Sequence, residues 1–179
     1  EPNTHNEWFP SISKIKYEGK ASSNPLAFKY YNPSEILMGK SMEDWLRFSA
    51  CFWHTFRGNG SDPFGSPTIS RHWDDGTNSI CNAKRRIDAA FEFFEKIGVK
   101  YYTFHDIDVS PESDTWTKTC ENLDIISDYL LECQNKTGIK LLWGTANLFS
   151  HPRYMNGGAT SPEFTSYAYA AAQVKKAME

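Results

Sequence analysis

The sequence lacks any long apolar segment and any strong excess of charge. No apolar run approaches the ~20 residues that a helix needs to cross a bilayer. The polar start EPNTHNEWFP also lacks the apolar core of a signal peptide. The formal net charge of -3 provides no electrostatic attraction for nucleic acid. We therefore expect no membrane-spanning segment and no nucleic-acid partner.

Closely spaced cysteines are absent too. Cys51, Cys81, Cys120 and Cys133 show none of the CxxC spacing typical of metal or redox sites. This favours buried thiols in a reducing cytosol, and so a cytoplasmic protein. The sequence also begins without methionine and ends at Lys-Lys-Ala-Met-Glu, inside a helical pattern. We therefore expect the chain to be part of a longer protein.

Apolar residues recur at steps of three and four in three segments, which predicts three helices. The first extends from the candidate N-cap Asn78 to Gly98, with the basic run 84–86 (Lys-Arg-Arg) on a solvated face. The second closes at Gly138 and is expected to bury Trp116, Leu123, Ile126, Leu130 and Cys133. The third begins at 160–163 (TSPE), with the proline at its first position. It is expected to bury Phe164, Tyr167, Ala168, Ala171, Val174 and Met178.

Strands are expected between these helices. Residues 47–56 and 99–104 are rich in aromatic and β-branched side chains, and 139–146 is apolar without alternation, as in a buried strand. For 47–56 a helix is the alternative. Repeated strand–helix units predict a parallel α/β sheet, either an open doubly wound sheet or a (β/α)8 barrel. No glycine-rich nucleotide-binding motif follows any strand. We expect an irregular N-terminal arm over 1–40. Residues 41–179 would then hold about the first three βα units of a barrel, which takes ~250 residues in full.

Reactive groups in parallel βα folds gather where strands end and loops begin. The stretch FHDIDVSPE (104–112) lies at such a point. Side chains alternate along a strand, so His105 and Asp106 should face opposite sides. Asp108 follows the strand end, where a turning backbone can bring its carboxylate to the ring and fix the imidazole tautomer. Such a pair could move a proton to or from a hydroxyl, or it could be a histidine satisfied by its own loop.

Metal ligation by these residues is not expected, because alternation keeps Asp106 away from the other two. Of Trp53 and His54, only one can face the pocket, and an inward Trp53 would form an apolar wall or simply pack in the core. Phe64, between Pro63 and Gly65, should be exposed until another surface covers it.

Thr145 and Asn147 close the third strand. Their short polar side chains could bind a polyol or satisfy their own turn. The stretch 151–153 (HPR) is expected to be loop structure rather than part of a site.

Together these stretches resemble one family, the xylose (glucose) isomerases, in the longer class with an N-terminal extension. FHDIDVSPE fits the family pattern aromatic/Leu-His-Asp-x-Asp-aliphatic-x-Pro. Further similar blocks cover essentially the whole sequence: NPLAFKYYN (24–32), DWLRFSACFWHTF (44–56), DPFG (62–65), LLWGTANLF (141–149), PRYMNGGATSP (152–162) and YAYAAAQVKKA (167–177).

The resemblance implies a TIM-barrel enzyme that interconverts D-xylose and D-xylulose, and D-glucose and D-fructose. His105 would assist opening of the sugar ring, held by Asp108, while Trp53 and Thr145 would line the sugar site. Phe64 would reach into the pocket of a neighbouring subunit of a homotetramer or homodimer.

The resemblance also implies two divalent ions, Mg²⁺, Mn²⁺ or Co²⁺, that promote a hydride shift. Their ligands would lie downstream of this chain, which offers no metal ligands itself and should be inactive alone. Two alternatives remain: a related sugar epimerase barrel, whose strand ends would carry metal-ligating Glu or His, and a non-catalytic sugar-binding module.

Overall fold

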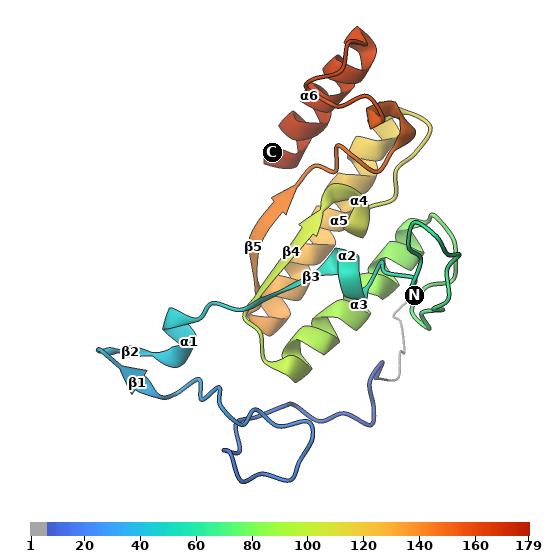
Figure 1. Ribbon diagram of the computed structural model, residues 1–179. Helices are drawn as coiled ribbons and strands as arrows, with labels where there is room; N and C mark the ends of the chain where they lie inside the picture. Colours follow the sequence, from blue (N-terminus) through green and yellow to red (C-terminus); the bar gives the residue numbers. More distant parts are fainter. Residues whose placement is uncertain (1–6) are drawn as a thin grey trace.

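A computed structural model describes residues 7–179 (Figure 1), and within them the chain is a mixed α/β structure. Its centre is a parallel sheet in the order β3–β4–β5, formed by Ser49–Cys51, Tyr101–His105 and Lys140–Thr145. The long helices α3 (Ile80–Ile97) and α5 (Trp116–Thr137) pack together against this sheet, and α6 (Phe164–Met178) follows β5. The parallel sheet with intervening helices was predicted and is confirmed.

Short elements connect these parts. A two-stranded antiparallel ribbon, β1 (Ile36–Leu37) and β2 (Lys40–Ser41), leads into helix α1 (Met42–Trp45). Short helical turns follow two of the parallel strands and the loop after the third; they are α2 (Phe52–Thr55), α4 (Asp106–Val109) and the 3-10 turn η1 (Pro152–Tyr154). None of the helices described within residues 7–179 is long and apolar enough to cross a membrane.

The long helices have well-defined ends. The N-cap of α3 is Ser79, whose side chain accepts a hydrogen bond from the Asn82 N–H, so the predicted cap Asn78 is wrong by one residue. Asn78 instead donates to the carbonyl of Glu112 at 2.7 Å. The helix stops at Gly98, which takes the left-handed conformation (φ 74°) that glycine adopts without steric cost.

The hydrophobic core lies between the sheet and the two long helices. Phe52, Phe94 and Tyr102 are fully buried, and the Phe94 and Tyr102 rings stack at 5.9 Å. Phe56 lies one helical turn after Phe52, with the rings 5.5 Å apart, so both enter the same core. The predicted strand over 47–56 is therefore wrong after residue 51, where the chain leaves the sheet and takes the helical alternative. Helical spacing places both phenylalanines on one side of the chain, and there both are buried.

Two burial predictions fail near the C-terminus. Every residue of β5 is exposed, because the strand lies at the edge of the sheet and the described helices leave it uncovered. In α6 the buried residues are Ala170 and Gln173, whereas Phe164 and Met178 are about four-fifths exposed. Helix α6 also begins at Phe164 with Glu163 as its N-cap, so the predicted start with a proline in the first turn is wrong.

Two further predictions need correction. The basic run of α3 is not wholly solvated, because Arg86 is only 4% exposed. The four thiols are free, but Cys133 alone is buried, while Cys81 is exposed. In α5 the predicted residues Ile126, Leu130 and Cys133 are buried, but Asn122 takes the core position expected of Leu123, and Trp116 and Leu123 are only partly covered.

The described part of the N-terminal segment is attached to α3 through charged groups. Both carboxylate oxygens of Glu92 accept backbone N–H groups, from Trp8 at 2.6 Å and from Phe9 at 2.8 Å. Lys96 forms ion pairs with Glu7 at 2.5 Å and with Glu92 at 3.3 Å. The start of the described N-terminal segment therefore packs on α3, although the arm boundary at residue 40 remains a prediction.

Candidate functional site

The site begins with the register of the parallel sheet. His105 is the last residue of β4 and pairs with Thr145, the last residue of β5. Trp53 follows the end of β3, in α2. The carboxyl ends of all three strands lie at the same edge of the sheet (Figure 1), which brings these residues together.

The change from strand to helix after His105 positions Asp108. His105 is the N-cap of α4, and its backbone N–H donates to Oδ2 of Asp108 at 2.8 Å. The same Oδ2 lies 3.0 Å from Nδ1 of the His105 ring. Both side chains are largely shielded from solvent, at 15% and 8% exposure. The contact predicted between these two residues is present, and one carboxylate oxygen holds both the backbone and the ring.

Aromatic rings surround the imidazole. The Trp53 ring lies 4.9 Å from it, and Phe149 meets it edge-on at 5.3 Å. Trp143 lies 6.1 Å from the imidazole and 5.5 Å from Trp53. Trp53 rather than the exposed His54 lines this group, although Trp53 lies in α2 and not on a strand.

Sequence reasoning did not select Trp143 or Phe149. Strand alternation could have identified Trp143, because it stands two residues before Thr145 and so shares its side of β5. Phe149 lies in the loop after β5, and the stretch LLWGTANLF carries no local signal that turns this ring back toward His105. Together with Trp53 they form what we call the aromatic wall: Trp53, Trp143 and Phe149.

The other predicted residues are placed differently. Phe64 is 99% exposed at the tip of a turn in which Asp62 Oδ1 accepts the Phe64 N–H at 2.7 Å. Within the described chain it therefore contacts none of the other predicted site residues. Asn147 is buried, and its side-chain oxygen accepts the N–H groups of Phe149 and Ser150. Asn147 thus satisfies its own turn, which was one of the two readings of this residue.

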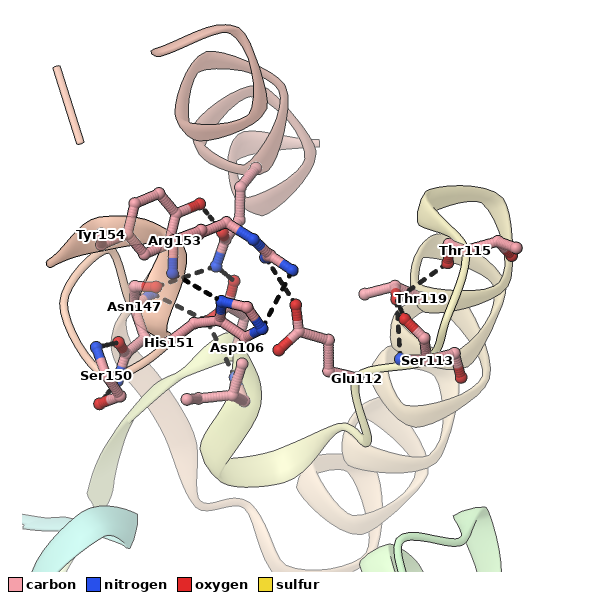
Figure 2. A network of polar contacts seen from close by, with 12 residues as sticks. Asp106, Glu112, Ser113, Thr115, Thr119, Asn147, Ser150, His151, Arg153 and Tyr154 are labelled. Atoms are coloured by element: carbon pink, nitrogen blue, oxygen red, sulfur yellow. Dashed lines mark hydrogen bonds and ion pairs between the residues drawn. The ribbon is translucent and has the colours of Figure 1, made fainter. Parts of the chain in front are cut away.

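Asp106 lies in a polar network with the loop after β5 and with α6 (Figure 2). Its carboxylate accepts hydrogen bonds from the backbone N–H of Asn147 at 2.9 Å and of Ile107 at 2.8 Å. A third bond comes from the Gln173 side chain of α6 at 2.7 Å. Burial raises the pKa of this carboxyl above its ordinary value. Asp106 therefore ties β4, the loop after β5 and α6 together.

A second part of this network lies between two loops. Arg153 forms an ion pair with Glu112 at 2.6 Å, which links the loop after β5 to the segment after α4 (Figure 2). The His151 ring accepts the Arg153 backbone N–H at 3.0 Å and caps η1. Residues 151–153 therefore form the start of η1 within the loop after β5, and the contacts of His151 and Arg153 here join parts of the fold.

The described residues do not form a metal site of their own. Among residues 7–179, no three His, Cys, Asp or Glu side chains converge as ligands. The carboxylate of Asp106 is taken up by its three donors, and Asp108 is held by His105. Any divalent ion at these strand ends would need ligands from outside the described residues.

The geometry defines a class of site: a histidine–aspartate pair beside an aromatic wall, at the carboxyl edge of a parallel βα sheet. Such a histidine can move a proton, and flat aromatic rings can pack against the apolar face of a small polar molecule.

Sequence comparison shows which known proteins this chain is similar to. The chain is a homologue of the xylose isomerases. It is 58% identical to the xylose isomerase of Hordeum vulgare and 57% identical to that of Arabidopsis thaliana, each over 97% of this chain. It is 54% identical to the xylose isomerase of Rhodopirellula baltica over 96% of this chain. The chain spans only 36% to 39% of the length of these relatives. No family model matches it.

Proposed function

We propose that this chain is part of a xylose isomerase, an aldose–ketose isomerase that interconverts D-xylose and D-xylulose and also D-glucose and D-fructose. The single observation that carries the proposal is the 3.0 Å contact of His105 Nδ1 with Asp108, at the end of β4 and beside Trp53. High identity to xylose isomerases over nearly the whole chain supports it. The parallel units would then be about the first three of a (β/α)8 barrel.

The proposed role of the pair is to open the sugar ring. A carboxylate on Nδ1 keeps the proton on that nitrogen and leaves Nε2 free to accept one. Nε2 would take the proton of the anomeric hydroxyl and return it to the ring oxygen as the bond from that oxygen to C1 breaks. The aldose is then linear, and no proton is gained or lost overall. Asp108 acts as a positioning residue, because it touches the imidazole rather than the sugar.

The remaining parts of the site follow from the same proposal. The aromatic wall would shield the sugar from water, with Trp53 and Thr145 at the substrate. Phe64, fully exposed on its loop, would enter the pocket of a neighbouring subunit in a homodimer or homotetramer. The Mg²⁺, Mn²⁺ or Co²⁺ ions that the relationship implies would supply the hydride-shift chemistry and be held by residues outside this chain. We further propose a cytoplasmic location.

A non-catalytic sugar-binding module is the second candidate, because aromatic rings lie beside His105 and the described residues 7–179 form no metal-ligating cluster. Two measurements on the purified full-length protein separate the candidates. An isomerase converts D-xylose to D-xylulose in the presence of Mg²⁺ or Mn²⁺. A binding module produces no ketose, and its calorimetric affinity for xylose is the same with and without Mn²⁺. Absence of D-xylulose with either metal would overturn the isomerase proposal.

A further inference from the structure

The ring of Phe149 lies 5.3 Å from the imidazole of His105, although few neighbours hold it there. Phe149 is 67% exposed, and among residues 7–179 the imidazole is the one ring that it contacts. A side chain with so few packing partners is positioned by its backbone rather than by a surrounding core. The place of this ring therefore depends on what fixes the loop after β5.

One buried side chain fixes that loop. Oδ1 of Asn147 accepts the N–H groups of Phe149 at 3.2 Å and of Ser150 at 2.8 Å. Its Nδ2 donates to Oγ of Ser150 at 2.9 Å, so both ends of the amide are used within this turn. Asn147 is only 5% exposed. Because water has little access to the amide, these bonds meet little competition from solvent and stabilise one conformation of the turn.

The backbone of Asn147 is anchored to two other elements. Its N–H donates to Oδ1 of Asp106 at 2.9 Å (Figure 2), and its carbonyl accepts from Nε2 of Gln173 at 3.1 Å. The same Nε2 also donates to Oδ2 of Asp106 at 2.7 Å, which closes a ring of three hydrogen bonds. All three residues are buried. The turn is therefore attached to the end of β4 and to α6 at once.

Asp106 directly follows His105, and this adjacency connects the turn to the imidazole. Asp108 holds the imidazole through its 3.0 Å contact with Nδ1. Asp106 holds the turn that carries Phe149. The imidazole and the Phe149 ring are thus placed from neighbouring points of one backbone. Removing the Asn147 side chain should release the Phe149 ring, because it leaves the backbone bonds to Asp106 and the contact of Asp108 in place.

We propose that Asn147 is a positioning residue of the sugar site, which holds the Phe149 ring against the imidazole, with Asp106 and Gln173 as its supports. The effect on the sugar rests on the proposed function, whereas the placement of the two rings depends on no activity. In an isomerase the Phe149 ring would pack on an apolar face of the sugar. Asn147 would then act on substrate binding through Phe149 without touching the sugar.

Nuclear magnetic resonance of ¹³C-labelled histidine in the full-length protein tests the placement. The aromatic ring of Phe149 shifts the nearby His105 ring protons, so Phe149→Leu measures that contribution, and His105→Gln identifies the resonance. We expect Asn147→Ala to move the His105 proton resonance toward its position in Phe149→Leu. The ¹⁵N shifts of the imidazole should stay unchanged, because Asp108 still holds Nδ1. An unmoved proton resonance in Asn147→Ala would overturn the proposal.

Asn147→Asp is the conservative variant, because it keeps an oxygen at the Oδ1 position and can accept the Ser150 hydroxyl with the other. It should restore the wild-type His105 resonance, and a displacement as large as that in Asn147→Ala would contradict the proposal. Asn147→Ser, whose shorter side chain still offers one acceptor, replaces the alanine variant if that fails to fold and should produce a smaller displacement.

Asn32→Ala is the matched control. Oδ1 of Asn32 accepts the Ser34 N–H at 3.3 Å, and its carbonyl accepts the Glu35 N–H at 3.1 Å, so this asparagine also fixes a turn of its own segment. Its loss should leave the His105 resonance where it is in the wild type. An equal displacement in Asn32→Ala would show that the effect is not specific to the turn at Asn147.

Steady-state kinetics with D-xylose and bound metal provide a second measurement. A ring that packs equally on substrate and transition state contributes to KM and not to kcat. Asn147→Ala and Phe149→Leu should each raise KM about tenfold, the low end of what one apolar contact contributes in a pocket, with kcat nearly unchanged. The double variant should be no worse than Phe149→Leu alone, because Asn147 acts through that ring. Additive losses would contradict the proposal. A wild type that forms no D-xylulose would overturn the proposed function and leave the resonance test intact, so the two failures are distinguishable.

Discussion

Replacing Asp108 with asparagine tests how the carboxylate acts on the imidazole. Both contacts of this carboxylate use the same oxygen, Oδ2, at 2.8 Å from the backbone N–H and 3.0 Å from Nδ1 of His105. An asparagine can place its single oxygen there and accept both bonds. The reverse orientation would set its NH2 group against the backbone N–H, which is unfavourable at a site only 8% exposed. The structure therefore predicts that Asp108→Asn keeps the histidine tautomer and loses only the negative charge.

The expected loss can be sized from the hydrogen bonds. A hydrogen bond to a charged group contributes ~1.5–3 kcal/mol, and a neutral one ~0.5–1.5 kcal/mol. The midpoints of these ranges differ by about 1.3 kcal/mol, which is close to tenfold in a rate if the lost charge stabilises the imidazolium in the transition state. We expect kcat/KM for cyclic D-xylose to fall about tenfold in Asp108→Asn. Asp108→Ala should fall further, because it frees the ring and also removes the helix cap.

Two measurements check this reasoning on the full-length protein. Steady-state kinetics compare the two variants, and ¹⁵N chemical shifts of the His105 ring report which nitrogen carries the proton. Wild-type kcat/KM in Asp108→Asn would refute a role for the charge. A proton moved to Nε2 in that variant would refute the anchoring of the oxygen by the backbone.

Four further outcomes follow from the same structure. His105→Gln should slow turnover of cyclic xylose by ~10²–10⁴-fold while calorimetric metal affinity is unchanged, and equal losses of both would contradict its role in ring opening. Gln173→Leu should lower the free energy of unfolding in urea by about 2–4 kcal/mol, because it removes one donor from the buried Asp106 carboxylate and the partner of the Tyr154 hydroxyl; a loss below 0.5 kcal/mol would show that the network is dispensable. Thr115→Ala should cost ~1 kcal/mol by removing the cap of α5, whereas the exposed Thr117→Ala, two residues later, should cost nothing. Because burial raises the pKa of Asp106, its ionisation costs stability, so Asp106→Asn should gain on the wild type as pH rises above the ordinary aspartate pKa; a pH-independent difference would count against this.

The parts of the fold that local chemistry determines could be predicted from the sequence. Gly98 and Gly138 end the two long helices as expected, since a left-handed residue at that position favours glycine. The contact of His105 with Asp108 followed from a strand that ends and a chain that turns. Both inferences needed only a few neighbouring residues.

The failed predictions concern burial that depends on distant parts of the structure. Apolar β5 was expected to be covered, yet its exposure depends on which elements lie beside it and not on its own residues. Likewise Gln173 reads as a polar surface residue of α6, but Asp106, 67 residues earlier, makes it a buried hydrogen-bond donor. Arg86 is a second buried polar residue of this kind. Periodicity places it in a helix, but its partners, Asp74 and the backbone carbonyl of Asp108, come from other segments. A hydrophobicity pattern cannot identify a buried polar residue whose partner is remote in sequence.

The two aspartates that flank His105 illustrate how a fold separates identical side chains. Between them the chain changes from strand to helix, so Asp106 follows the alternation of β4 and turns toward α6, while Asp108 returns by one helical turn to the ring. Asp106 becomes a buried structural acceptor whose pKa is raised, and Asp108 remains next to the group that would handle the proton. The proton-transfer proposal therefore depends less on the presence of two acids than on the residue at which β4 ends. One more residue of strand would carry Asp108 away from the imidazole and leave His105 without its partner.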